Sequence, residues 1–275
     1  MRYKWNLKET APEQAAEAAR LAKEAGVHPV LGKLLLDRGL NDPQEVKRFF
    51  RPQLTELHDP FLMDDMQTAV DRLNRAMLQN ERVMIYGDYD VDGCTAVALV
   101  FRFLRQYYSN LDTYIPDRYK EGYGISRAGV DYAAETGVRL VIVLDCGIKA
   151  VEEIAYARSL GIDFIICDHH VPGLELPPAV AILNPKRLDN HYPYAHLSGC
   201  GVGFKFMQAF AISNGIEFNK LIPLRRQHRR RYSANYGRKP YPGLARTSVS
   251  QYKPFDRPAS HHRGVRTDGT RADNE

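Results

Sequence analysis

Carboxylate and imidazole side chains follow three aliphatic runs of this sequence, at residues 83–86, 140–144 and 164–167. The side chains are those of Asp88, Asp90, Asp92, Asp145, Asp168, His169 and His170. The aliphatic runs predict buried parallel strands, so each polar cluster is expected at the carboxyl end of a strand, where open α/β sheets bind their ligands. The clustered carboxylates would repel one another without a cation. This donor set therefore indicates a divalent metal centre, and its many oxygens favour Mn²⁺ or Mg²⁺ over structural zinc.

Simpler explanations exist for single members of this set. An aspartate after a strand often caps the next helix, which would account for Asp145 taken alone. The Asp92-Gly93 pair could mark only a turn. Three aspartates that alternate within five residues, with no neighbouring Lys or Arg, fit a turn poorly. A His pair after a buried strand must also send at least one ring away from the apolar face. Together the three motifs favour the metal centre.

The elements that would position these residues alternate between strand and helix from residue 82 to about 214. The pattern predicts helices over 93–108, 126–136, 149–160 and 200–214, and one more short strand over 180–183. Such alternation is typical of an α/β fold with a right-handed parallel sheet flanked by helices. Residues 10–80 instead have helical patterns, over 15–25, 29–36 and 66–78. We therefore expect a helical N-terminal segment over 1–80 and an α/β domain over 81–224.

The three motifs resemble the successive motifs of the DHH phosphoesterase superfamily, which is named for the triplet found here at 168–170. The closer resemblance is to its RecJ family of single-strand-specific 5′→3′ exonucleases. Further strings similar to that family are Asp-Pro-Phe-Leu (59–62), Asp-Asp-Met (64–66), Ile-Pro-Asp-Arg-Tyr (115–119), Glu-Gly-Tyr-Gly (121–124) and Leu-Ser-Gly-Cys-Gly-Val-Gly (197–203). The resemblance covers about residues 1–224 and implies a DHH-type parallel sheet.

The RecJ resemblance implies metal-dependent hydrolysis of single-stranded DNA from its 5′ end, in DNA repair and recombination. The residues that it implies as metal ligands are Asp90, Asp92, Asp145 and His169, with Asp88 beside them. Two ions, Mn²⁺ or Mg²⁺, would activate a water for in-line attack and stabilise the leaving oxygen. The expected catalytic residues are Asp145, Asp168 and His170. His170 would contact the scissile phosphate or assist the leaving group, and its alternative role is that of a second ligand.

Two groups of residues outside the acidic motifs are candidates for substrate binding. In the first group, Arg118 could pair with a phosphate, and Tyr119 and Tyr123 could stack on bases. A surface ion pair between Arg118 and Glu121 explains the arginine equally well.

The second group consists of the glycines before the last predicted helix, Gly199, Gly201 and Gly203. They resemble a backbone amide cradle for phosphate at a helix N-terminus. The alternative is that they allow a helix and a strand to pack closely. Lys205 lies one turn further along, where its partner could be solvent or phosphate.

Length and composition are typical of a globular protein. The 275 residues, 44% of them hydrophobic, suffice for one large or two small domains. No stretch resembles a signal peptide or reaches membrane-spanning length. The cysteines at 94, 146, 167 and 200 are too widely spaced for a zinc knuckle or a disulfide framework, so we expect buried, reduced thiols. The expected protein is a cytoplasmic monomer with no membrane partner and with single-stranded DNA as its partner.

Residues 225–275 have a different composition from the rest of the chain. They contain eleven Arg and two Lys against four acidic residues, a charge of +9, whereas residues 1–224 carry −4. Their only large aliphatic residues are Leu244, Val249 and Val265, so a disordered tail is expected. One interpretation is a basic nucleic-acid-binding arm with interleaved tyrosines. The other is a frameshift near Leu224. Codons that are permitted for the residues from Arg225 onward can, when read one base later, encode Ala-Val-Ser-Ile-Ala-Val-Asp-Ile. This string resembles the next RecJ segment, whose aspartate is a further metal-site residue in that family.

The frameshift interpretation predicts that the tail neither packs as a domain nor supplies a metal ligand. Because the RecJ family continues into a second domain, we expect a truncated exonuclease with impaired activity.

Two other functions remain open: a DHH phosphoesterase for short oligonucleotides, cyclic dinucleotides or pyrophosphate, and a non-catalytic nucleic-acid-binding fragment. Deleting residues 225–275 would abolish salt-sensitive binding only if the tail is a binding arm. The coding DNA around codon 224 would decide between a frameshift and such an arm.

Overall fold

A parallel sheet of five strands forms the centre of the fold, which a computed structural model describes for residues 11–221. The strands are β1 (Arg82–Gly87), β2 (Leu111–Tyr114), β3 (Val138–Leu144), β4 (Asp163–Cys167) and β5 (Ala181–Leu183). They pair in the order β2-β1-β3-β4-β5, and every pair is parallel. The chain passes from β1 outward to β2 and then returns to the other side of β1 with β3. In such sheets the carboxyl ends of the strands at this reversal are the usual place for a ligand.

The predicted parallel sheet flanked by helices is confirmed. The aliphatic runs at 83–86, 140–144, 164–167 and 180–183 overlap β1, β3, β4 and β5. The remaining strand, β2, lies outside the predicted strands because its sequence, Leu-Asp-Thr-Tyr, is only half apolar. β2 forms one edge of the sheet and pairs with β1, and none of its residues is fully buried. An edge strand of this kind lacks the continuous apolar run that marks a central parallel strand.

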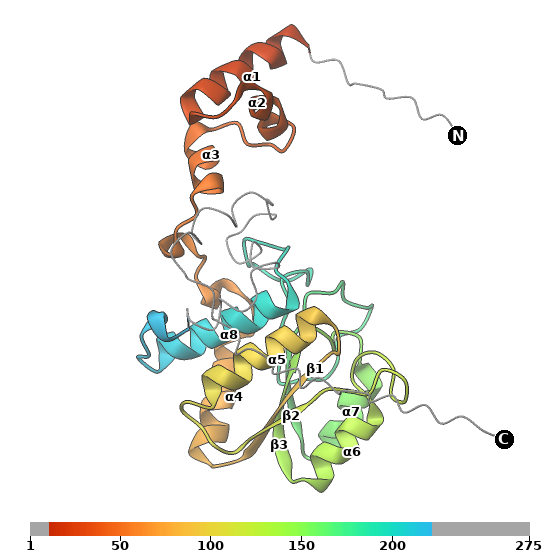
Figure 1. The fold of residues 1–275 in the computed structure, drawn as a ribbon. Helices are drawn as coiled ribbons and strands as arrows, with labels where there is room; N and C mark the ends of the chain where they lie inside the picture. Colours follow the sequence, from red (N-terminus) through yellow and green to blue (C-terminus); the bar gives the residue numbers. More distant parts are fainter. Residues whose placement is uncertain (1–10, 222–275) are drawn as a thin grey trace, which may run out of the picture. The chain divides into compact units, whose positions relative to one another are not determined.

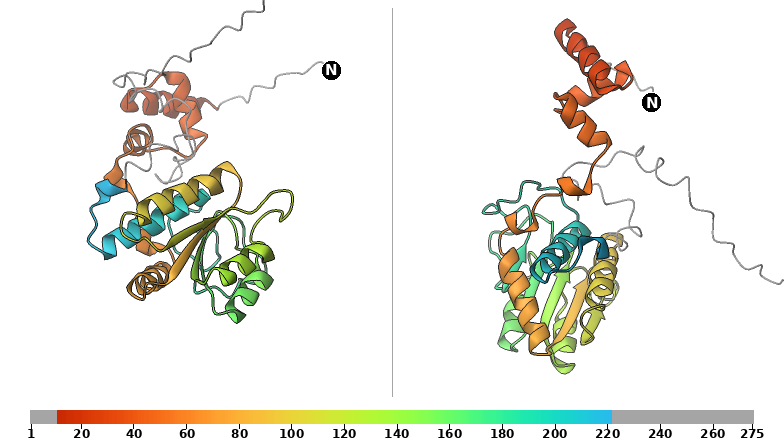
Figure 2. Two further views of the ribbon diagram at one scale, coloured as in Figure 1. Left: turned by 60° about the horizontal axis from the view of Figure 1, so that its bottom comes forward. Right: turned by 90° about the vertical axis from the view of Figure 1, so that its left-hand side faces the viewer.

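Helices cover both faces of the sheet (Figure 1, Figure 2). One face carries α4 (Met66–Leu78), α5 (Val91–Leu104) and α8 (Gly199–Ser213), and the other carries α6 (Arg127–Glu135) and α7 (Val151–Ser159). The residues of β3 alternate between the two cores: Leu140, Ile142 and Leu144 pack on the first, and Val141 and Val143 pack on the second. Because successive side chains of a strand point to opposite faces, a strand buried on both sides is apolar throughout.

The predicted helices of the α/β region are present, with ends that differ by a few residues from the sequence pattern. α5 begins at Val91, two residues before the predicted start at residue 93. Its N-cap is Asp90, whose Oδ1 accepts hydrogen bonds from the amides of Asp92 at 2.6 Å and Gly93 at 3.0 Å. An aspartate in this position satisfies amides that the helix itself leaves unpaired. The acidic motif after β1 therefore also starts the next helix.

The N-terminal helices form two groups. α1 (Pro12–Ala25), α2 (Pro29–Leu36) and α3 (Pro43–Phe50) share a small core of Leu21, Leu35 and Val46. Short 3-10 turns follow at Leu54–Glu56 and Pro60–Leu62, and a third, Phe218–Lys220, follows α8. The apolar face of α4 instead belongs to the core formed with α5 and α8. α4 therefore buries its apolar stripe against the sheet rather than against α1, α2 and α3, and the predicted domain boundary at residue 80 stays a prediction.

Two further expectations concern the thiols and the tail. Cys146, Cys167 and Cys200 are buried free thiols as predicted, but Cys94 is exposed. It lies on the outer side of α5, whose inner side is formed by residues such as Ala96 and Val97.

The tail over 225–275, with its expected disorder, lies outside the described residues. Over residues 11–221, no helix combines the length and the apolar character that crossing a membrane requires.

Candidate metal centre

The loop after β1 gives three aspartates three different environments. Asp88 is fully buried, and neither of its carboxylate oxygens makes a well-aligned hydrogen bond within the described part of the chain. Asp90 caps α5. Asp92, in the first turn of α5, is buried, and its two oxygens accept hydrogen bonds from the amides of Gly199 and Cys200, each at 3.1 Å. The start of α8 therefore holds the Asp92 carboxylate, because helix N-termini stabilise negative charge.

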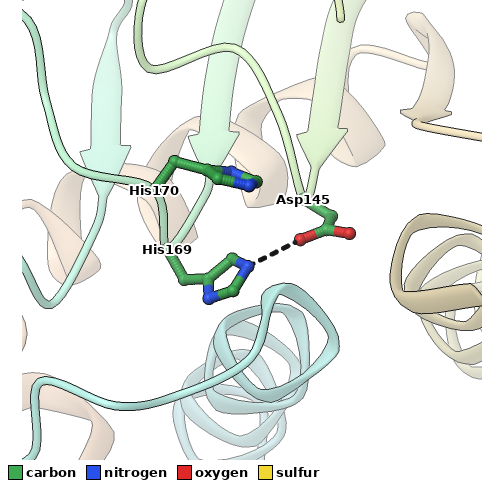
Figure 3. A group of neighbouring side chains, drawn as sticks. All are labelled: Asp145, His169 and His170. Carbon is green, nitrogen blue, oxygen red and sulfur yellow. Dashed lines mark ion pairs between the residues drawn. The ribbon is translucent and has the colours of Figure 1, made fainter. Parts of the chain in front are cut away.

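Asp145 follows β3 in a backbone conformation that is unusual for a residue with a side chain. Its φ is 64°, in the left-handed region, which Asp and Asn tolerate better than most other residues. Its amide donates to the carbonyl of Cys167 at 2.9 Å, which ties the turn to the end of β4. Its carboxylate is buried, and Oδ1 lies 3.1 Å from Nε2 of His169. The turn thus directs the Asp145 carboxylate toward the His169 ring (Figure 3).

His169 brings the motifs together. Its Nε2 lies 3.1 Å from Oδ1 of Asp145 and 3.9 Å from Oδ2 of Asp92. One ligand atom from each of Asp145, His169 and His170 lies within 4.8 Å of the other two, and Figure 3 shows both rings directed toward Asp145. Three of the four implied ligand residues, Asp92, Asp145 and His169, therefore face one another at the carboxyl ends of β1, β3 and β4. The fourth, Asp90, uses one oxygen as a helix cap.

Asp168 holds the neighbouring ring, that of His170. The buried carboxylate of Asp168 accepts hydrogen bonds from the amides of Ile148 at 3.0 Å, His169 at 2.6 Å and His170 at 3.1 Å. Its Oδ1 also lies 2.7 Å from Nδ1 of His170. This contact leaves Nε2 of the half-exposed His170 ring available, 3.4 Å from the hydroxyl of Tyr123. The contacts of Asp168 are those of a residue that orients His170, and its predicted catalytic role stays a prediction.

Burial and neighbouring charges shift several pKa values of this site. Burial raises the pKa of Asp145 to about 6, against the opposing effect of His169, and the charge of Asp92 adds to the rise. Burial also raises the pKa of Asp88. Burial alone would raise the pKa of Asp168, but the hydrogen bonds from His170 and Ile148 lower it. The hydrogen bond with Asp168 in turn raises the pKa of His170. The raised pKa values of Asp88 and Asp145 indicate that burial disfavours their charged forms, a cost that a bound cation would relieve.

The residues present fit a hard divalent cation. Both oxygens of Asp88 are buried without a well-aligned hydrogen bond among the residues described, whereas Oδ1 of Asp145, also buried, has Nε2 of His169 at 3.1 Å. Buried polar atoms without partners are costly and rare in proteins, so each such atom needs an explanation. Carboxylate oxygens combined with imidazole nitrogen form a donor set that suits Mn²⁺. A metal bound between β1, β3 and β4 would account for these atoms.

The glycines at the start of α8 are engaged within the protein. The amide of Gly199 donates to Asp92, and that of Gly201 donates at 3.1 Å to Oγ of Ser198, the N-cap of the helix. A Cβ added at Gly203 would lie 3.0 Å from Cδ2 of Leu144. These contacts favour close packing of the helix against the sheet over the predicted phosphate cradle. Both interpretations use the same glycine spacing, so the sequence pattern did not separate them.

An aromatic group lies beside His170, in part from the loop between β2 and α6. The rings of Tyr123 and His170 meet edge to face with centroids 6.1 Å apart, and those of Tyr123 and Tyr89 at 6.3 Å. The guanidinium of Arg118 lies 5.3 Å from the centre of the Tyr89 ring, within the range of a cation–π contact. Tyr89 is a member that the sequence interpretation missed. The sequence feature that could have identified Tyr89 is its position as an aromatic residue between Asp88 and Asp90 of the acidic motif.

Contacts within the protein also account for Glu121 and Lys205. Glu121 accepts hydrogen bonds from the hydroxyls of Tyr114 and Ser126, which explains this acid without an ion pair to Arg118. Lys205 faces neither solvent nor a phosphate site. It is fully buried, and its Nζ donates to the carbonyl of His58 at 2.6 Å and to the amide oxygen of Gln208 at 2.8 Å.

Replacing Asp168 with asparagine is expected to lower the pKa of His170. The hydrogen bond with Asp168 is the main cause that raises this pKa, and asparagine keeps the shape of the side chain while removing its charge. An NMR titration of the ring proton in the metal-free chain measures the change. Asp131→Asn is the control, because Asp131 bonds the hydroxyl of Tyr156 at 2.8 Å. An equal pKa of His170 in both variants would contradict the contact.

Sequence comparison identifies relatives of the chain. Residues 82–226 match the DHH family, N-terminal domain. The chain is 41% identical over 189 residues to the single-stranded-DNA-specific exonuclease RecJ of Bacillus subtilis (strain 168), and 37% identical over 186 residues to that of Escherichia coli (strain K12). These alignments cover 69% and 67% of this chain but 24% and 32% of the two relatives. The chain thus spans about a quarter to a third of the length of these relatives.

Two solved structures share the fold. RecJ from Thermus thermophilus, solved in complex with Mn²⁺, superposes with a TM-score of 0.60 at 25% identity, over 77% of this chain and 29% of that one. An exonuclease RecJ bound to manganese superposes with a TM-score of 0.52 at 30% identity, over 56% of this chain and 39% of that one. Both of these similar proteins were solved with manganese.

Proposed function

This chain belongs to the DHH family, and we propose that it hydrolyses phosphodiester bonds of single-stranded DNA from the 5′ end, in DNA repair and recombination. The observation that carries the proposal is the convergence of Asp92, Asp145 and His169 beside the reversal of the sheet. Support comes from the relative named as a single-stranded-DNA-specific exonuclease, to which the chain is 41% identical over the aligned region. An acidic centre at this place suits a negatively charged substrate only when cations neutralise it.

Asp92, Asp145 and His169 would hold the metal, Mn²⁺ or Mg²⁺, and Asp88 and Asp90 would contribute to a site for two ions. Such ions, when bound, lower the pKa of a water and stabilise charge on the leaving oxygen. The protein supplies the orientation of the donors. The amides of Gly199 and Cys200 hold Asp92, and the left-handed turn directs Asp145 toward His169.

His170 would handle a proton at the scissile phosphate. Its Nδ1 is engaged with Asp168 at 2.7 Å, so the proton that it exchanges with the substrate is on Nε2. The hydrogen bond with Asp168 raises the pKa of His170 and so favours the protonated ring. A protonated Nε2 can donate to the leaving oxygen as a general acid.

Arg118 and the nearby tyrosines would bind the strand next to the centre. Arg118 can form two parallel hydrogen bonds with a phosphate. Tyr119 is 94% exposed and Tyr123 is 58% exposed, so both rings can receive a base. Tyr123 also lies against His170, which places this contact beside the proposed general acid.

The full chain is expected to degrade single-stranded DNA in a Mn²⁺-dependent manner, because the donors described here bind metal rather than activate water directly. A 5′-labelled strand should release labelled mononucleotide at once, whereas a 3′-labelled strand should shorten gradually. Blunt duplex DNA of the same sequence serves as the control and should persist. Cleavage that continues in excess chelator would contradict the metal centre. Cleavage restricted to very short oligonucleotides or cyclic dinucleotides would instead identify a small-substrate phosphoesterase.

A further inference from the structure

Gly199, the first residue of α8, lies against both carboxylates of the candidate metal centre. Its amide donates at 3.1 Å to Oδ2 of Asp92, the oxygen that lies 3.9 Å from Nε2 of His169. On its other side is Asp145, where a Cβ built on Gly199 would lie 2.2 Å from Oδ1. That oxygen lies 3.1 Å from the same Nε2. Gly199 thus contacts, on each carboxylate, the oxygen that faces His169.

The position cannot accept a side chain without moving one of these carboxylates. The added Cβ would also lie 2.5 Å from both Cβ and Cγ of Asp145, so the clash involves the root of that side chain and not its flexible end. The backbone of Asp145 is tied to β4 by the hydrogen bond to Cys167. The start of α8 is tied to Asp92 through the amides of Gly199 and Cys200. To remove this clash, either the Asp145 side chain would have to rotate, or the start of α8 would have to move away from Asp145 together with Asp92.

We propose that Gly199 is a positioning residue of the metal centre. Its amide orients Asp92, and its missing side chain leaves the space that the Asp145 carboxylate occupies. The inference rests on the proposed metal-dependent function and assigns to this glycine a part in metal affinity. Residues that orient metal ligands typically change metal affinity by 10- to 100-fold when they are replaced. Gly199→Ala is therefore expected to weaken Mn²⁺ binding by about 10- to 100-fold.

The first experiment is a titration of the full chain with Mn²⁺, followed by the electron paramagnetic resonance signal of the free ion. Gly129→Ala is the matched control, because Gly129 is also in the first turn of a helix, and its added Cβ would lie 2.8 Å from Cε2 of Tyr86. The control should lose packing but keep the Mn²⁺ affinity of the unaltered chain. A folded Gly199→Ala chain that binds Mn²⁺ as tightly as the unaltered chain would overturn the proposal.

A second experiment does not depend on metal and covers the case in which Gly199→Ala folds poorly. Thermal stability is measured in excess chelator for Gly199→Ala, Asp145→Gly and the double variant. Glycine at 145 removes the Cβ as well as the carboxylate and tolerates the φ of 64°, so the added methyl group has room, and Gly199→Ala should lower Tm far less in the Asp145→Gly chain than in the unaltered chain. If the decrease in Tm of the double variant equals the sum of the decreases of the two single variants, the proposed contact between Gly199 and Asp145 is wrong. Absence of Mn²⁺ binding by the unaltered chain would instead refute the proposed function, and with it the role of Gly199 in metal affinity.

Discussion

Replacing His169 with alanine is expected to lower the rate of single-strand cleavage by about 10³-fold or more. Nε2 of this ring lies 3.1 Å from Asp145 and 3.9 Å from Asp92, so the variant lacks the donor that joins two buried carboxylates. A bound metal supplies several kcal/mol of transition-state stabilisation, and about 1.4 kcal/mol corresponds to a factor of ten in rate. Initial rates on labelled single-stranded DNA at a fixed Mn²⁺ concentration measure the loss.

His191→Ala is the matched control for this variant. The His191 side chain is 82% exposed and pairs with Asp64, outside the loops that follow β1, β3 and β4. Its removal should leave the rate unchanged. The side chain of His169 is itself 24% exposed, so water can fill the space that alanine leaves, and circular dichroism should show a folded chain. A folded His169→Ala chain with an unreduced rate would contradict the assignment of the centre.

Replacing Arg72 with methionine is expected to lower the free energy of unfolding by about 2–3 kcal/mol. Arg72 is buried in α4, where its Nε donates at 2.6 Å to Asp163 and its Nη2 donates at 2.7 Å to Glu81. Breaking a buried ion pair costs about 3–5 kcal/mol when a charge is left without its partner. The expected loss is smaller here because Asp163 is 40% exposed and can be rehydrated. Urea denaturation in the presence of chelator measures the change.

Arg75→Met provides the comparison for Arg72→Met, because Arg75 is an exposed residue of the same helix. Exposed substitutions of this kind usually change stability by less than about 0.5 kcal/mol. Asp163 begins β4 and Glu81 precedes β1, so both partners of Arg72 lie at the amino ends of the strands, opposite the candidate metal centre. Mn²⁺ affinity should therefore stay unchanged in both variants. Equal free energies of unfolding for Arg72→Met and Arg75→Met would show that Arg72 does not stabilise the packing of α4 against the sheet.

The sheet and the location of the centre could be predicted because both follow from local patterns. Aliphatic runs mark β1, β3 and β4, since strands buried on both faces must be apolar along their whole length. Parallel strands end at one edge, so polar residues that follow each run are expected to meet. The proximity of Asp145 and His169 agrees with that reasoning. β2 lies outside the prediction because an edge strand needs no continuous apolar run.

Only the tertiary structure decided which partner each polar group has. Gly199 and Asp92 are 107 residues apart, and the hydrogen bond between them depends on where α8 lies against the sheet. A series of glycines before a helix is compatible with phosphate binding or with close packing, and the hydrogen bonds from the amides of Gly199 and Cys200 to the Asp92 carboxylate favour close packing. Lys205 is similar, because its carbonyl partner, His58, comes from a segment far away in sequence. Short-range backbone preferences and apolar periodicity determine where strands and helices form, whereas the partner of a polar side chain depends on contacts between distant segments, which a local sequence pattern does not encode.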